Sequence, residues 1–233
     1  MNTPVPSTEL DDRALQLSHR RIISTDSSAP LFYFVHGRAG DSSVMMLFQR
    51  CVPEGASIVS VQAPLPDSLG GFSWWNIEQG RKPSKEEVLV AAGQLEGFIT
   101  RFENRFELSP KKRIAFGFSQ GGGVLSAVLQ KGSVAFDGLA FLASFVIPLG
   151  SFGALSLECQ QKTSTEIFWG HGTLDEVISI ERARKDVSLL QQSGFVVHFF
   201  EDSIGHKIGA RSFRELQSFS AKIVGKSDSS RNS

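Results

Sequence analysis

The 233-residue sequence predicts an α/β fold with a mostly parallel central sheet and helices on both of its faces. Short runs rich in β-branched and aromatic residues alternate with longer segments of helical periodicity, as in parallel sheets. The chain is 41% hydrophobic, which is enough for one sizeable core. Composition does not change along the chain and no internal repeat is visible, so we expect a single domain over residues 1–224.

In the first half of the chain, strands are expected at residues 21–24, 31–35 and 58–62. Each run is nearly continuous in apolar residues or is bounded by turn formers. A helix is expected at residues 42–50, between the second and third strands. The helix at 85–106 is the most periodic, and we expect its apolar stripe to face the core. The stripe consists of Val88, Leu89, Ala92, Leu95, Phe98, Ile99 and Phe102.

The second half continues the same alternation and ends in a polar tail. The helix after the strand at 113–118 begins with glycines, so its first turn is nearly free of side chains. The tail at 225–233 is polar enough to be disordered. The remaining strands are expected at 138–143, 166–169 and 195–200, and the helices at 121–131, 180–193 and 209–224.

Charge and cysteine content exclude several functional classes. Lys+Arg and Asp+Glu both number 24, so no net field would attract nucleic acid. The basic run at 111–113 is interpreted as a solvated entrance to a strand. Cys51 and Cys159 are far apart and lack metal-type spacing, which predicts neither a disulfide framework nor a metal site.

A membrane-spanning segment is not expected either. Residues 138–157 carry no charge and are about long enough to cross a bilayer. Pro148, Gly150 and Gly153 interrupt this segment, which favours a buried strand followed by an apolar loop. The N-terminal residues do not resemble a secretory signal, so we expect a cytoplasmic protein without stable membrane insertion.

The stretch FGFSQGGG at residues 116–123 is the most informative motif. A phosphate-binding loop would need lysine where Gly123 stands, and a dinucleotide fingerprint would need glycine in place of Ser119. The pattern Gly117-x-Ser119-x-Gly121 matches a nucleophile elbow, in which serine occupies a strained turn between a strand and a helix. The predicted strand and helix flank it as required, so Ser119 is the candidate nucleophile.

A serine nucleophile needs a histidine base, which follows it in the chain in this architecture. His19 and His36 precede Ser119, and His198 lies inside a predicted strand. His171 lies just after a predicted strand and ahead of an acid. His206 is in the loop between the last strand and the last helix, where its side chain can reach over the sheet edge. It is the candidate base.

The candidate for the orienting acid is Asp175, which follows the strand at 166–169 at the carboxyl edge of the sheet. Asp202 is the alternative, only four residues before His206 in the same loop. Asp137 precedes its strand and so lies at the opposite end of the sheet. Asp175 is preferred because three separate loops let serine, acid and base converge from different directions.

Two backbone amides are expected to form an oxyanion hole. The amide after the nucleophile belongs to Gln120. The second donor should come from the glycine-containing loop after the strand at 31–35, and the amide of Arg38 is the candidate.

Six segments together resemble the phospholipase/carboxylesterase family of α/β-hydrolases, which includes the acyl-protein thioesterases. The resemblance implies the α/β-hydrolase fold without a large lid domain, no cofactor, and activity on carboxylic esters or thioesters. It also implies Ser119, Asp175 and His206 as the catalytic triad, in agreement with the assignment above. The segments are FVHGRAGD (34–41), VQAPLP (61–66), FSWWNI (72–77), GFSQGG (117–122), HGTLDEVI (171–178) and GHKI (205–208).

One departure bears on the substrate. Leucine is typical of the thioesterase branch at the position of Arg38, so we expect a cationic side chain near the pocket mouth rather than a site for long-chain acyl-proteins. An apolar loop after the strand at 138–143 and an aromatic cluster are candidates for acyl-group binding, with packing beneath the oxyanion loop as the alternative for the cluster. These candidates are Phe72, Trp74, Trp75, Phe145 and Val146.

The sequence therefore predicts a serine hydrolase that cleaves small to medium carboxylic esters through an acyl-enzyme. Peptide or lactone hydrolysis would use the same triad. A non-catalytic binding protein that retains the fold is the alternative from another class, and a homodimer is compatible with the apolar surface expected near the pocket.

Overall fold

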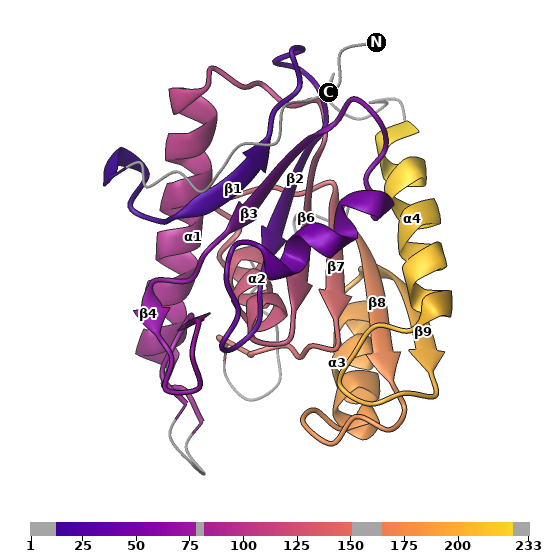
Figure 1. The fold of residues 1–233 in the computed structure, drawn as a ribbon. Coiled ribbons are helices and arrows are strands. Elements are labelled where there is room, and N and C mark those ends of the chain that lie inside the picture. The colour runs from indigo at the N-terminus through magenta and orange to yellow at the C-terminus, as the bar shows by residue number, and fades with distance from the viewer. Residues whose placement is uncertain (1–12, 78–81, 151–164, 226–233) are drawn as a thin grey trace.

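The computed structural model describes residues 13–77, 82–150 and 165–225. Within these residues, seven strands form the main sheet in the order β1-β3-β2-β6-β7-β8-β9 (Figure 1). Every neighbouring pair is parallel except β1 with β3, which confirms the predicted class. The strands are β1 (His19–Ile22), β2 (Leu31–Val35), β3 (Ser57–Val61), β6 (Arg113–Phe118), β7 (Gly138–Leu142), β8 (Glu166–Gly172) and β9 (Val196–Asp202), with a separate hairpin of β4 (Leu65–Pro66) and β5 (Phe72–Ser73).

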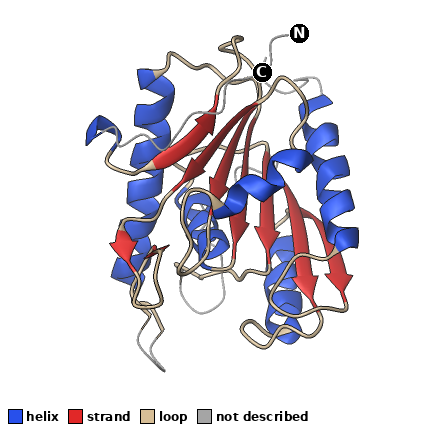
Figure 2. Ribbon diagram, in the orientation of Figure 1, coloured by secondary structure: helices blue, strands red, loops and turns tan. Residues whose placement is uncertain are grey.

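Helices cover both faces of the sheet (Figure 2). One face carries α1 (Lys85–Arg105), α2 (Gln120–Lys131) and α3 (Ile180–Gln192). The other carries α4 (Ala210–Gly225) and the 3₁₀ helix η2 (Val44–Cys51), and a short η1 (Arg13–Leu15) precedes β1.

Element types agree with the sequence predictions, and several boundaries differ. The segment predicted as a helix at 42–50 forms a 3₁₀ helix. Strand β1 begins two residues earlier than predicted, while β8 and β9 extend beyond their predicted ends to Gly172 and Asp202. The longer strands pair with each other along their whole length, from Glu166 opposite Val196 to Gly172 opposite Asp202.

Helix α1 begins where its sequence provides a cap. The hydroxyl of Ser84 accepts a hydrogen bond from the Glu87 amide, and the Glu87 carboxylate accepts one from the Ser84 amide. The predicted apolar stripe is buried except for Leu89, which is half-buried at its edge, and Ala91 joins it.

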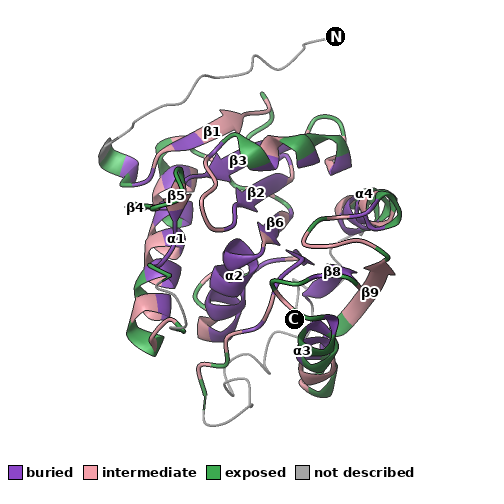
Figure 3. Cartoon of the chain, turned by 60° about the horizontal axis from the view of Figure 1, so that its bottom comes forward, coloured by how far each residue is buried: buried purple, intermediate pink, exposed green. Residues whose placement is uncertain are grey.

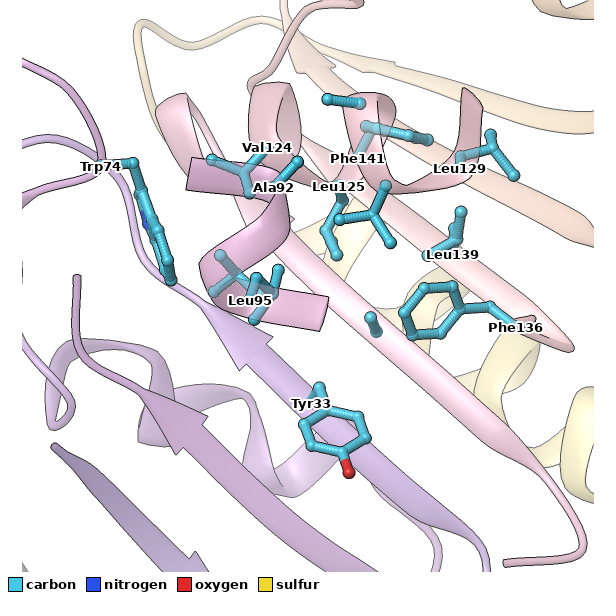
Figure 4. Packing of buried hydrophobic residues seen from close by; sticks show 14 of the residues in the cluster. Tyr33, Trp74, Ala92, Leu95, Val124, Leu125, Leu129, Phe136, Leu139 and Phe141 are labelled. Atoms are coloured by element: carbon cyan, nitrogen blue, oxygen red, sulfur yellow. The ribbon is translucent and has the colours of Figure 1, made fainter. Parts of the chain in front are cut away.

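The core consists of two clusters, one on each face of the sheet. Figure 4 shows part of the larger cluster, to which α1 contributes Leu95, α2 contributes Leu125 and β7 contributes Leu139. Each fully buried side chain of this size contributes about 1.5–3 kcal/mol to folding. Trp74 also belongs to this cluster.

The carboxyl ends of β2 and β6 form a topological switch point. The two strands are parallel neighbours, with Val35 opposite Gly117. After β2 the chain turns to η2 on one face, and after β6 it turns to α2 on the opposite face (Figure 1). The two loops therefore leave the sheet side by side, at the position where open α/β sheets bind ligands. Figure 3 brings this edge of the sheet forward.

Some predicted features fall outside the described residues: Cys159, most of the tail at 225–233, and the second part of the apolar segment at 138–157. Among the helices that the structure describes, none combines the length and apolar character that a bilayer crossing requires.

Candidate active site

Ser119 stands in a strained turn between β6 and α2. Its φ of 49° and ψ of −117° lie in a region that residues with a side chain rarely adopt. A Cβ on Gly117 would lie 2.6 Å from the Cα of Gly122, so the turn requires glycine there. A Cβ on Gly121 would lie 2.1 Å from the carbonyl oxygen of Val35. The nearest obstacle to a side chain at Gly121 is therefore the end of β2.

The turn is fixed by the loop that follows β7. The amide of Ser119 donates to the last carbonyl of β7 at 2.9 Å, and the hydroxyl of Ser144 donates to the Ser119 carbonyl at 2.7 Å. A Cβ on Gly122 would lie 2.1 Å from the Ser144 Oγ, and one on Gly123 would lie 3.0 Å from the Phe145 ring. Glycine at positions 122 and 123 therefore lets the first turn of α2 pack closely against this loop.

His206 and Asp175 meet across two loops at the carboxyl edge. The His206 Nδ1 lies 2.7 Å from the Asp175 Oδ2. A Cβ on Gly172 would lie 2.3 Å from the Gly205 carbonyl, so glycine lets the two loops approach closely. The His206 ring also packs against Phe118, with centroids 5.1 Å apart, immediately before Ser119 in the chain.

Asp175 is buried and fully bonded. Its Oδ1 accepts hydrogen bonds of 2.9 Å from the amides of Val177 and Ile178. Burial pushes the pKa of Asp175 upward, but the Ile178 amide, His206 and the Val177 amide together outweigh it and bring the pKa below its ordinary value. The carboxylate therefore stays ionised at neutral pH, and the His206 Nδ1 carries the proton that it accepts.

The other acids considered from the sequence lie elsewhere. Asp202 accepts hydrogen bonds from the amide and the hydroxyl of Ser212, in the first turn of α4. Asp137 lies at the opposite edge of the sheet, where it binds Lys112 and the Arg113 amide. Neither carboxylate is bonded to His206 in the described contacts.

Two buried histidines hold the loops of this edge and were not assigned a role from the sequence. The His171 Nε2 lies 2.8 Å from the Ile178 carbonyl, and its Nδ1 accepts from the Trp169 indole at 3.4 Å. Burial lowers the pKa of His171, so the ring is neutral and donates to the loop that presents Asp175. The signal that could have identified it is a His-Gly pair after an apolar run, which occurs twice in the chain.

The second His-Gly pair, His36-Gly37, begins the predicted oxyanion loop. The His36 Nδ1 lies 2.6 Å from the Gly37 carbonyl, and its Nε2 accepts from the Ala63 amide at 2.9 Å. Burial lowers the pKa of His36. A Cβ on Gly37 would lie 3.1 Å from the Ser119 Cβ, so the loop passes directly beside the serine. The amide of Arg38 follows this closest approach by one residue.

The Arg38 side chain turns away toward the β4–β5 hairpin. Its Nε donates to the Asp67 Oδ2 at 3.0 Å, and Ser73 donates to the same oxygen at 2.6 Å. Hydrogen bonds from Ser73 and the Leu69 amide, together with Arg38, lower the pKa of Asp67 to about 2. The cation expected near the pocket mouth is present and is paired with this carboxylate.

The Gln120 side chain adds a structural role to the amide assigned from the sequence. It is buried, and its Oε1 accepts from the Trp74 amide at 2.8 Å while its Nε2 donates to the Trp75 carbonyl at 3.0 Å. The Trp74 indole donates to the His36 carbonyl at 3.0 Å. The aromatic segment thus joins the first turn of α2 to the oxyanion loop.

Two cavities adjoin His206, and the larger one also adjoins Ser119. The larger, of about 970 Å³, is lined by both residues and by Gln120. The smaller, of about 450 Å³, lies on the η2 side, is lined mainly by apolar residues, and shares Arg38, Phe118 and His206 with the first.

Of the predicted acyl-binding residues, Trp75 and Phe145 line the larger cavity. Phe72, Trp74 and Val146 line neither cavity. Trp74 and Val146 are buried in the core, and Phe72 packs against it and pairs with Pro66 in the hairpin. The positions of Phe72 and Trp74 agree with the packing alternative for the aromatic cluster.

The sheet order and the switch-point site define an α/β-hydrolase. The sequence model of the phospholipase/carboxylesterase family matches residues 18–224, and the chain belongs to this family. It is therefore a hydrolase of the carboxylesterase and thioesterase type, as the sequence motifs predicted.

Individual relatives agree with this placement. Acyl-protein thioesterase 1 of Candida albicans is 26% identical over 232 residues, covering 91% of this chain and 100% of that protein. A probable carboxylesterase of Oryza sativa subsp. japonica is 28% identical over 154 residues, covering 63% of this chain and 56% of the relative. Among solved structures, a carboxylesterase from Mesorhizobium loti has a TM-score of 0.78 at 18% identity, covering 92% and 98% of the two chains. The Bacillus cereus carboxylesterase has a TM-score of 0.77 at 18% identity, with coverage of 89% and 94%.

Proposed function

We propose that the protein cleaves carboxylic esters of small to medium acyl groups through an acyl-enzyme, with thioesters as the alternative substrate. One observation carries the proposal: the 2.7 Å contact between the His206 Nδ1 and the Asp175 Oδ2 belongs to a histidine that lines the same cavity as Ser119. A base held by a buried carboxylate next to a strained serine is the arrangement that nucleophilic catalysis requires.

The reaction follows from these roles. With the Nδ1 proton directed to Asp175, the His206 Nε2 is free to accept the proton of the Ser119 hydroxyl as its oxygen attacks the ester carbonyl. The ionised Asp175 stabilises the imidazolium that forms. His206 then gives this proton to the departing alcohol, which leaves an acyl group on Ser119. Water then loses a proton to His206 as it attacks the acyl carbonyl, and His206 returns this proton to the Ser119 oxygen as the acid departs.

The negative charge that develops on the carbonyl oxygen needs hydrogen-bond donors, and we assign this role to the backbone amides of Gln120 and Arg38. Gln120 is the first residue of α2, whose N-terminal amides lack partners within the helix. Arg38 lies one residue beyond the point where Gly37 passes Ser119. Each such donor typically contributes about 10²–10³ to kcat.

The cavity supports a substrate of modest size. Near Ser119 its wall includes Trp75, Phe145 and Ile147, which suits an acyl or aryl group. The relatives are named as a thioesterase and a probable carboxylesterase, which supports ester and thioester substrates in preference to peptides. Lactone or peptide hydrolysis would use the same triad. The cytoplasmic location expected from the sequence stays a prediction.

A series of 4-nitrophenyl esters of increasing acyl length tests the proposal, with Ser119→Ala and His206→Ala beside the wild type. We expect the wild type to hydrolyse the short and medium esters and each variant to lose at least about 10³-fold in kcat/KM. A serine-directed phosphonate should label the wild type and not Ser119→Ala. If the wild type neither hydrolyses any ester or thioester nor reacts with the phosphonate, it is a binding protein with a hydrolase fold.

The acid is tested separately by comparing Asp175→Asn with Asp202→Asn. The first change removes the acceptor of the His206 Nδ1 proton, and we expect kcat to fall by about 10³–10⁴. The second leaves a side-chain oxygen that can accept the hydrogen bonds from Ser212 in the first turn of α4, and we expect kcat to be largely kept. A larger loss of kcat in Asp202→Asn would reverse the assignment.

A further inference from the structure

The charged residues that line the larger cavity are unbalanced. Arg38, Lys82, Arg182 and Lys185 are cationic, and Asp186 is the one carboxylate among its described lining residues. The chain as a whole has equal numbers of cations and anions, 24 of each. The excess of positive charge is therefore a property of this cavity and not of the protein surface in general.

Both arginines already have carboxylate partners. Arg38 pairs with Asp67 at 3.0 Å. The Arg182 Nε lies 3.0 and 2.9 Å from the two oxygens of Asp186, and its terminal nitrogen donates to the Val146 carbonyl at 2.5 Å. These contacts fix the cavity wall at α3 and at the loop after β7, and they use much of the arginine charge within the protein.

The two lysines differ from the arginines in this respect. Lys82 precedes α1 and Lys185 lies on α3, so they reach the cavity from different elements, and both are exposed. Among the described residues, neither ammonium has a carboxylate within ion-pair distance. Glu181, one turn before Lys185 on α3, is fully exposed and is not part of the lining. Two cationic groups at the mouth are thus available to a ligand.

The larger cavity combines an apolar inner wall with cationic groups at its mouth, and this combination indicates the kind of substrate that it can bind. The wall near Ser119 is apolar, with Trp75 almost completely buried and Phe145 half-buried, whereas Lys82 and Lys185 lie in the exposed part. We propose that this enzyme selects esters in which an apolar segment separates the reacting carbonyl from a carboxylate, with the carboxylate held at the cavity mouth by Lys82 and Lys185. This inference rests on the proposed function. A cationic cleft both attracts such substrates from solution and orients them.

The test compares matched pairs of esters that differ only in a terminal group. One pair is a mono-4-nitrophenyl ester of a dicarboxylic acid and its terminal carboxamide, and the second pair carries the same two groups on the alcohol side of an acetate ester. We expect kcat/KM of the wild type to favour the carboxylate in at least one pair. Lys82→Gln and Lys185→Gln should each lower the carboxylate-to-carboxamide ratio about two- to fivefold, the range of exposed charge pairs. Added salt should lower the ratio in the wild type.

Two further lysines serve as controls. Lys111→Gln makes the same charge change on an exposed lysine just before β6, at the opposite edge of the sheet, and Lys207→Gln makes it in the smaller cavity. Neither should change the ratio as much as Lys185→Gln. A wild-type ratio of one or less in both pairs, with the carboxamides hydrolysed, overturns the inference and leaves the proposed function intact. An equal effect of Lys111→Gln or Lys207→Gln also overturns it, and hydrolysis of no ester at all removes both.

Discussion

Replacing Gln120 by methionine separates the structural role of this side chain from the catalytic role of its amide. The side chain is 2% exposed and bonds the Trp74 amide at 2.8 Å and the Trp75 carbonyl at 3.0 Å. Methionine keeps the length and most of the volume, so it removes the two hydrogen bonds without opening a large cavity. The backbone amide of residue 120 remains.

The structure gives the size of the effect. Two buried backbone groups lose their partners, and each such group costs about 1–3 kcal/mol, so the free energy of unfolding should fall by roughly 2–6 kcal/mol. For a chain of this length the lower limit corresponds to a fall in Tm of about 4 °C or more. Below Tm we expect kcat to stay within about tenfold of the wild type, since loss of an oxyanion donor would cost about 10²–10³.

Urea unfolding followed by tryptophan fluorescence measures the stability, and 4-nitrophenyl butyrate hydrolysis measures kcat. The matched control is Gln192→Met at the exposed end of α3, which should change the free energy of unfolding by less than about 0.5 kcal/mol. If Gln120→Met is as stable as the control, the two hydrogen bonds do not hold the aromatic segment. If stability is kept and kcat falls about 10³-fold, the side chain rather than the amide acts in catalysis.

Two further predictions concern glycine and histidine. Gly121→Ala places a Cβ 2.1 Å from a β2 carbonyl, so we expect little folded protein on expression and low activity in what folds. The control is Gly93→Ala on α1, where the nearest atom to the new Cβ is 3.9 Å away. This change should stabilise the protein by about 0.5–1 kcal/mol. Equal stability of the two variants in urea unfolding would contradict the proposed contact with β2. Burial lowers the pKa of His36 and His171, so as pH falls below about 6.5 the unfolded chain takes up protons that the folded protein does not. The free energy of unfolding should therefore decrease toward acid pH by up to about 1.4 kcal/mol per pH unit for each histidine. His36→Asn should reduce this slope. A slope that the substitution leaves unchanged would show that His36 does not contribute to it.

The local features of the site follow from the sequence because they depend on neighbours along the chain. The elbow at Ser119 needs a strand before it, glycines around it and a helix after it, all within 20 residues of each other. Parallel strands then place the loops with Asp175, His206 and Arg38 at one edge of the sheet, whatever the details of packing. The alternation of elements and the chain order of the motifs were sufficient for the fold class, the family and the candidate triad residues.

Other features depend on residues that are distant in sequence and meet only through packing. The sequence favoured Asp175 over Asp202 only because separate loops can converge, and the structure adds the contact itself: His206 bonds a residue 31 positions earlier rather than one four positions away. Periodicity cannot show which of two adjacent tryptophans faces a cavity, and the structure places Trp75 on its wall and Trp74 in the core.

Charge at the site illustrates the same limit. The sequence is neutral overall, and the single cation predicted at the mouth, Arg38, is neutralised by Asp67, a residue 29 positions away. Lys82 and Lys185, which have no carboxylate within ion-pair distance among the described residues, are more than 100 positions apart in the chain. Local sequence thus determined the elbow and the order of its partners, and tertiary structure alone decided which charges face the cavity, because pairing between charged groups depends on distance in space and not along the chain.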